Sequence, residues 1–309
     1  MNKGLNRFAI LVACATFCLI IAGALVTSHD AGLATPDWPL SNGQVFPKMV
    51  GNLFWEHGHR MIATTVGLLT IVLVIYILAK EERSWVRRLA KFALIAVIAQ
   101  GLLGGLTVKL MLPLPVSTAH ATLAQLFFCT TVSLAVFTSR SWMEARVLPA
   151  EGKGIPPLRY LCAAALVAIF LQLIIGATLR HSATWDQRLP AELILAHIGG
   201  ALAVVVMLGF ATLTVLRRHN GQHFLTRPAT LALMLLFVQL FLGVSAYITR
   251  LRSPYDPQPL NPMVGITVAH VACGALVFAT TIVLTLRVIK VLPAPVQEFE
   301  REARLPARS

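Results

Sequence analysis

Eight long apolar stretches constrain the fold of this 309-residue chain more than any other feature. Each approaches or exceeds the roughly 20 residues that a helix needs to cross the hydrocarbon of a bilayer. Hydrophobic residues make up 57% of the chain and charged residues 13%, which is typical of polytopic membrane proteins. We therefore predict an all-α fold of eight transmembrane helices, at residues 8–28, 60–79, 89–108, 117–138, 159–179, 193–216, 228–249 and 264–289.

The basic residues predict the orientation of these helices. With the N-terminus in the cytoplasm, the outer segments hold few of the 26 lysines and arginines: Lys48, Arg60, Lys109, Arg180, Arg188, Arg250 and Arg252. This asymmetry places both termini inside, and it assigns the net charge of +13 to topology and anionic lipid rather than to nucleic acid. Residues 8–28 are too long for the apolar core of a cleavable signal peptide, and no transit peptide precedes them. We expect a bacterial inner membrane protein.

The two halves of the chain resemble each other. "IIAGALVT" in the first stretch is similar to "LIIGATLR" in the fifth, and "TAHATLAQLFF" around His120 is similar to "VAHVACGALVF" around His270. Gln100, Leu103 and Gly104 likewise match Gln239, Leu242 and Gly243. Both halves start inside, so the repeat is a parallel one about an axis along the membrane normal. It predicts two pseudo-symmetric four-helix bundles, residues 1–140 and 141–309.

One histidine recurs near the outer end of every even-numbered stretch: His59, His120, His197 and His270. Ionisable groups at membrane depth are costly, so a repeated set indicates a functional site. A single such histidine can simply hydrogen-bond a neighbouring helix, but four equivalent ones favour two haem sites with paired axial ligands. Small residues follow them, at Ala121, Ala124, Gly199, Gly200 and Gly274, and would let helix backbones approach a flat macrocycle. The other histidines are expected to be solvated or interfacial: His29, His57, His181, His219 and His223.

The halves differ beside these histidines. Glu56 lies one helical turn before His59, whereas Ile194 occupies the matching place before His197. Arg60 likewise corresponds to Ile198. One interpretation makes the first half a chemical site and the second an electron-transfer site. The other makes Glu56 an interfacial acid paired with Arg60.

The first outer connection, residues 29–58, is rich in turn-forming residues and in aromatic side chains. These aromatics suit either a membrane-interface belt or a lid over an outward-facing site. All five cysteines lie within the predicted spans, so we expect no disulfide in an outer loop, and no motif for covalent haem attachment occurs.

At "PDWPLSNG", "EHGHR" and "AHATLAQ" the sequence resembles the haem A synthase family, over nearly the whole chain. Members are eight-helix membrane enzymes that oxidise a methyl group of haem O to the formyl group of haem A, for terminal oxidase assembly. The resemblance implies that His59 and His120 bracket the substrate haem O, and that His197 and His270 ligate a resident haem b. It also implies a catalytic part for Glu56. One departure is Ser41, because some members carry a cysteine there with a partner in the same loop.

Further expectations concern partners and alternatives. Arg180, Arg250 and Arg252 are candidates for binding haem propionates, or else ordinary interfacial anchors. Haem O synthase and terminal oxidase subunit I are candidate protein partners, and the electron acceptor is not named by the sequence. The alternative function is a di-haem electron carrier of the cytochrome b type. A transporter is disfavoured because the ionisable groups cluster at the outer end rather than at the midplane.

Overall fold

A computed structural model describes residues 2–149, 156–186, 189–252 and 261–292. Within these ranges the chain folds into eight helices long and apolar enough to cross a membrane. They are α1 (Lys3–Ser28), α2 (Asn52–Lys80), α3 (Ser84–Lys109), α4 (Leu114–Phe137), α6 (Leu158–Asp186), α7 (Ala191–Arg218), α8 (His223–Arg252) and α9 (Asn261–Val291). The eight predicted spans are thus confirmed, and the described part of the chain forms a multi-pass, all-α membrane protein.

The helices run further than the apolar stretches that predicted them. The largest difference is in α2, which begins at Asn52 instead of residue 60 and so includes Glu56 and His59. Its polar first turns remain helical because their side chains hydrogen-bond the preceding loop. The short helix α5 (Arg140–Met143), capped by the hydroxyl of Ser139, has no counterpart among the predicted elements.

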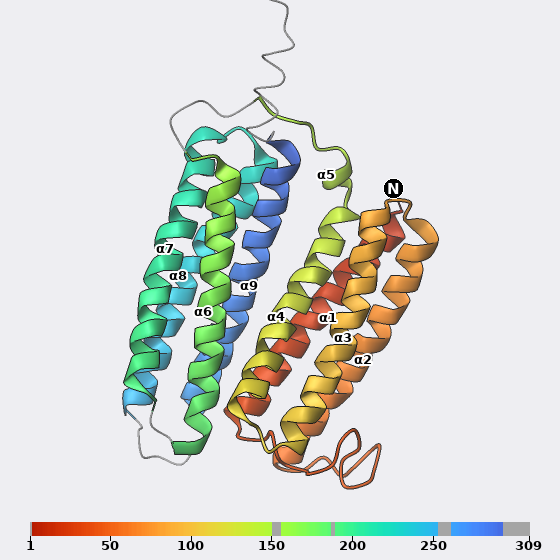
Figure 1. Cartoon of the computed structure of the whole chain (residues 1–309), viewed down its shortest axis with the longest axis vertical. Coiled ribbons are helices and arrows are strands. Elements are labelled where there is room, and N and C mark those ends of the chain that lie inside the picture. The colour runs from red at the N-terminus through yellow and green to blue at the C-terminus, as the bar shows by residue number, and fades with distance from the viewer. Residues whose placement is uncertain (1, 150–155, 187–188, 253–260, 293–309) are drawn as a thin grey trace, which may run out of the picture.

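The helices form two groups side by side, α1–α4 and α6–α9, connected past α5 (Figure 1). Helix α1 contacts α2 and α4, and α6 contacts α7 and α9 in the same pattern. Between the groups, α1 meets α9, α4 meets α6, and α4 meets α9. Exchanging the halves leaves this set of neighbours unchanged, which is consistent with the pseudo-symmetry expected from the repeat.

The central helices are α4 and α9, which bury the largest shares of their apolar residues. One core cluster joins the halves and includes Ile20, Phe128, Ile169 and Phe278. The rings of Phe17 and Phe128 lie 5.6 Å apart within it. Helices α7 and α8 are the least buried, and they leave large apolar side chains exposed, as lipid-facing helices do.

The start of α1 and the end of α9 lie at one end of the molecule, and the loop that precedes α2 lies at the other (Figure 1). All four repeated histidines belong to the loop end, because each falls in the first third of its helix.

Candidate functional site: two histidine pairs

Each of the four histidines packs against a glycine on the preceding helix. The carbon that alanine would add at Gly23 on α1 would lie 3.2 Å from Cε1 of His59 on α2. The same construction recurs between later helices, with distances of 3.1 Å for Gly104 and His120, 2.9 Å for Gly176 and His197, and 3.0 Å for Gly243 and His270. These contacts are tighter than an ordinary van der Waals contact, so a side chain at any of the four glycines would push against an imidazole.

A glutamine lies one turn before three of these four glycines and contacts the same histidine. The amide Nε2 of Gln172 lies 3.0 Å from His197 Nδ1 and donates to the backbone oxygen of His197 at 2.8 Å. Gln100 Nε2 lies 3.4 Å from the other ring nitrogen, Nε2, of His120 and donates to the backbone oxygen of His120 at 3.0 Å. Gln239 Nε2 lies 3.3 Å from His270 Nε2. Each glutamine therefore orients one imidazole.

Two of the small residues expected to flank a macrocycle instead accommodate these glutamines. A side chain at Gly200 would collide with Oε1 of Gln172, at 2.1 Å, and one at Gly274 would approach Nε2 of Gln239 to 3.2 Å. Gly199 has no atom within 4 Å of where its side chain would start. The glycines of α7 and α9 thus make room for the partner of the histidine.

The repeat contained the signal for this arrangement, although we read it only as internal similarity. Gly23 matches Gly176, and the Gln100–Gly104 pair matches the Gln239–Gly243 pair at the same spacing of four residues. That spacing places glutamine and glycine on one helical face. The face to which they point becomes evident only when the helices are packed together.

The second histidine pair fits the axial ligands of a haem iron. The ring centres of His197 and His270 lie 6.4 Å apart. An imidazole nitrogen binds a transition metal at about 2.0 Å, so two rings on opposite sides of one metal have centres roughly 6 Å apart. Within the described residues no group of three or more His, Cys, Asp or Glu side chains could hold a bare metal ion. A haem iron, held by its macrocycle, requires only the axial pair.

Unpartnered polar atoms mark both histidine pairs. Within the described residues, Nδ1 of His59, His120 and His270 is buried without a hydrogen bond, as is Oε1 of Gln100, Gln172 and Gln239. Buried polar groups normally have partners, so each such group calls for an explanation. In the first pair, His59 and His120 are close enough to interact electrostatically. Both pairs therefore offer nitrogen ligands at half-buried positions.

Glu56 is buried and held by two donors at the start of α2. Its carboxylate accepts a hydrogen bond from the backbone N–H of Thr35 at 3.0 Å and forms an ion pair with Arg60. The pairing with Arg60 matches one of the two interpretations of this acid. Its burial, at 4% exposure, separates Glu56 from an ordinary acid at the membrane surface. The second bundle has Ile194 and Ile198 at the corresponding positions.

The expectation that His57 is solvated or interfacial is wrong. His57 is 5% exposed, and both of its ring nitrogens bind the loop that precedes α2: Nδ1 to the Ser41 hydroxyl at 2.8 Å and Nε2 to the Val45 carbonyl at 3.0 Å. Arg60 also donates to the Leu40 carbonyl and to the Ser41 hydroxyl. These partners lie outside the helix, in the preceding loop. The position of His57 on the helix, on a different face from His59, therefore gave no sign of them.

The loop that His57 and Arg60 hold covers the end of the first bundle at which the histidines lie. Trp38 packs on α3, where the carbon that alanine would add at Gly105 would lie 2.7 Å from its indole. The ring of His29 stacks on Trp55 with centres 4.0 Å apart, so this histidine also has a structural partner. Phe46, in contrast, is 78% exposed. The aromatic side chains of this region therefore divide between contacts with the protein and the surface.

The arginines expected near propionates differ in their surroundings. Arg180 on α6 reaches across to α1, donating to the Ala24 carbonyl at 3.2 Å and to the Ser28 hydroxyl at 2.6 Å. Arg250 is half-buried near the end of α8. The side chain of Arg252 lies outside the described residues. His181, next to Arg180, is half-buried and interacts electrostatically with His120 of the first half.

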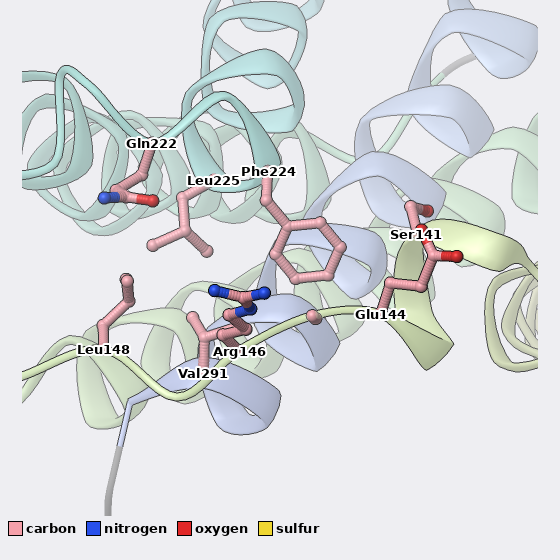
Figure 2. Close-up of a pocket in the computed structure, with 9 residues that line it drawn as sticks. Ser141, Glu144, Arg146, Leu148, Gln222, Phe224, Leu225 and Val291 are labelled. Atoms are coloured by element: carbon pink, nitrogen blue, oxygen red, sulfur yellow. The ribbon is translucent and has the colours of Figure 1, made fainter.

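A cavity of about 260 Å³ opens at the opposite end of the molecule, between the segment after α5, the start of α8 and the end of α9 (Figure 2). Phe224 and Arg146 face each other across it. Val291 in its wall is 21 residues beyond His270 on the same helix, a separation of about 30 Å at 1.5 Å per residue. This cavity is therefore distinct from the histidine pairs. The five cysteines lie within helices, and none of them forms a disulfide in the described part of the chain.

Eight membrane-length helices and two histidine pairs define a multi-pass membrane protein suited to binding haem. The family model described as "Cytochrome oxidase assembly protein" matches residues 48–282, and the chain belongs to this family. A heme A synthase of Bacillus licheniformis is 25% identical over 276 residues, covering 81% of this chain and 88% of the relative. That of Geobacillus kaustophilus is 22% identical and covers 98% and 97%. That of Caulobacter vibrioides is 32% identical over a shorter region, covering 43% and 40%. The resemblance to the haem A synthase family is thereby confirmed.

Proposed function

We propose that this chain is a haem A synthase, an oxidoreductase that converts a methyl group of haem O to the formyl group of haem A for terminal oxidase assembly. One observation carries the proposal beyond family membership. The first histidine pair has a buried carboxylate, Glu56, on the same helix as His59, whereas the second pair has Ile194 at the matching position. A molecule that only conducts electrons has no need for an acid in one half alone.

In this proposal, residues 1–140 form the substrate bundle and residues 141–309 the haem b bundle. His59 and His120 hold haem O, while His197 and His270 hold a resident haem b, which supplies a relay for electrons to an acceptor outside the chain. The glutamines that contact three of the imidazoles, and the glycines on which all four imidazoles pack, fix the positions of the rings. The protein sits in a bacterial inner membrane, with both termini in the cytoplasm and the haem sites towards the outer face.

The oxidation of the substrate requires water and the removal of four electrons. The methyl group first becomes an alcohol, taking oxygen from water and releasing two electrons and two protons. A second, identical oxidation gives the hydrated aldehyde, which loses water to leave the formyl group. Glu56 stabilises positive charge that develops at the methyl carbon, or accepts a proton from the attacking water. The Arg60 and Thr35 donors hold its carboxylate in one orientation.

Arg180 is the best placed of the arginines to bind a propionate. It lies half-buried between the halves, and its hydrogen-bond partners among the described residues are neutral oxygen atoms of α1 rather than a carboxylate. A buried cation without an opposite charge is costly, and a propionate would supply that charge. Arg250 and Arg252, at the end of α8, are the further candidates.

The test is to express the chain with a source of haem O and to extract the haems. Haem A, identified by its shifted pyridine haemochrome spectrum, supports the proposal, and haem b alone favours the di-haem electron carrier. Glu56→Ala is expected to abolish haem A while haem b stays bound. Ile194→Ala, at the matching position of the second bundle, is the control and should leave haem A formation intact. Haem A made by Glu56→Ala at the normal rate would exclude the proposed role of Glu56.

A further inference from the structure

The four histidines are held in two different ways. His120, His197 and His270 each contact a glutamine one turn before the glycine on which the imidazole packs. His59 packs on Gly23 in the same manner, but Leu19 occupies the place of the glutamine. Within the described part of the chain, neither ring nitrogen of His59 has a hydrogen bond. The difference is confined to one of four otherwise equivalent helix pairs.

A second position differs between the His59 and His197 units. Gly200 follows His197 by three residues and makes room for Gln172, whose Oε1 lies where a side chain would begin. The residue three positions after His59 is Ile62. Gln100 contacts His120 although Leu123 stands at this place, so the glutamine is the feature that the His59 unit alone lacks. The His59 unit thus differs from the His197 unit at both positions and from the His120 unit at the glutamine.

Polar partners fix the ring orientation of a histidine ligand, and removing such partners typically reduces metal affinity about 10- to 100-fold. We propose that His59 is the exchangeable axial ligand, so that haem enters and leaves the first bundle by making and breaking the bond to His59. His120, held by Gln100, keeps its position throughout. The exchange involves no change of oxidation state, because only the bond between the imidazole nitrogen and iron forms and breaks.

This assignment rests on the proposed function and gives the two bundles different kinetics. An enzyme must release its product haem, whereas a resident cofactor must stay. His197 and His270 both have glutamine partners, which suits a haem that is retained. Leu19 and Ile62 then determine turnover through product release, and they act through the ligand without touching the reacting atoms.

The experiment compares haem release from the two bundles of the full-length protein, purified after expression with a haem O source. Excess apomyoglobin captures the haem that dissociates, and extraction of the remaining haem distinguishes haem O and haem A from haem b. In the unaltered protein, haem O and haem A should leave faster than haem b. The double variant Leu19→Gln with Ile62→Gly should slow their release about tenfold or more, and Leu19→Met is the apolar control.

The reverse variant is Gln172→Leu, which should accelerate the loss of haem b about tenfold and leave haem O release unchanged. If the double variant does not accumulate, Gln172→Leu alone tests whether a glutamine partner slows haem release. Unchanged haem O release from its first bundle shows that this variant is correctly folded. Added cyanide, which competes with an axial histidine, should bind the first haem before the second, and this difference should shrink in the double variant. A merely structural role of the glutamine would not alter that order.

Equal release rates in the unaltered protein and the double variant, or no effect of Gln172→Leu, would overturn this assignment while leaving the proposed function in place. Failure of the proposed function has a different signature. If His59→Ala and His120→Ala bind as much haem O as the unaltered protein, the first bundle is not the substrate site, and the exchangeable ligand is excluded with it.

Discussion

The two bundles share the way in which their histidines are seated and differ in what surrounds them. In both, the imidazoles pack on glycines of the preceding helix. The first bundle adds a buried Glu56–Arg60 ion pair and a loop hydrogen-bonded across the end that holds its histidines, and it lacks one glutamine. A duplicated frame can hold two similar cofactors. In the function proposed above, changes at these few positions make the first site reactive and its haem exchangeable, while the second site retains its haem.

The largest effects should come from the histidines themselves and should separate the bundles. His270→Ala is expected to lose haem b completely, because it removes one of two axial ligands from a half-buried site. His120→Ala should keep haem b and make no haem A. The pyridine haemochrome of each purified variant measures both. Loss of haem b in His120→Ala with its retention in His270→Ala would reverse the assignment of the bundles.

The glycines behind the imidazoles should give the next largest effects, in either bundle. Gly176→Ala places a carbon 2.9 Å from His197 Cε1, so the ring or its helix must move. Overpacking of this kind costs about 1–3 kcal/mol. We expect lower haem b occupancy, measured as haem per protein after purification.

A matched pair of glycines in each bundle controls for helix propensity. Gly199→Ala in the second bundle and Gly101→Ala in the first add the same carbon where no atom lies within 4 Å. Both should retain full haem. Gly104→Ala, one turn from Gly101, should lower occupancy of the first bundle only. An equal loss in Gly101→Ala and Gly104→Ala would mean that contact with His120 is not the cause.

The loop over the first bundle should matter for haem A formation and not for haem b. His57→Ala removes the ring nitrogen that pairs with the buried Ser41 hydroxyl and the one that pairs with the Val45 carbonyl, and the loss at Ser41 costs about 1–3 kcal/mol. We expect haem A formation to fall about tenfold, and limited proteolysis between residues 29 and 51 to become faster. Lys48→Ala, in an exposed part of the same loop, should change neither. Normal haem A formation by His57→Ala would show that the loop is not needed for the chemistry.

Much of the fold was predictable because hydropathy and helix length are local properties. All eight spans were found from apolar runs, and the histidines from their recurrence in the repeat. The first two turns of α2 were missed because Glu56 and His57 interrupt the apolar pattern. Their polar groups are satisfied by Thr35, Ser41 and nearby backbone, which no local pattern reports.

The parts of the site that depend on packing between helices could not be predicted. Gln172 and Gly176 were visible as neighbours on one helical face, but their contact with His197 requires knowing which face of α6 meets α7. The same holds for Arg180, whose partners on α1 lie more than 150 residues away. Periodicity gives the face of a helix, and only the packing of the helices gives the partner.

The ends of the bundles opposite the histidines offer the smallest expected effect. The turn between α2 and α3 has an ion pair in which Arg83 donates to Glu81 at 2.8 and 2.7 Å, whereas the turn between α7 and α8 is closed by a backbone hydrogen bond from Gln222 to His219. The hydrogen bond from Arg83 holds the pKa of Glu81 below its usual value of 4.5. Glu81 therefore stabilises the fold at neutral pH, and this contribution is lost as the pH falls below 4.5 through the lowered pKa.

Glu81→Gln should consequently lower the free energy of unfolding by less than about 1 kcal/mol at pH 7, because ion pairs in partly exposed turns contribute little. The difference between the variant and the unaltered protein should vanish at acidic pH. Thermal unfolding in detergent at pH 7 and below pH 4 measures this, with Glu82→Gln at the exposed neighbouring position as the control. A difference that stays constant across this range would contradict an ionised Glu81 as the stabilising group. The haem content of both variants should be unchanged, because Glu81 and Glu82 lie at the opposite end of α2 from His59.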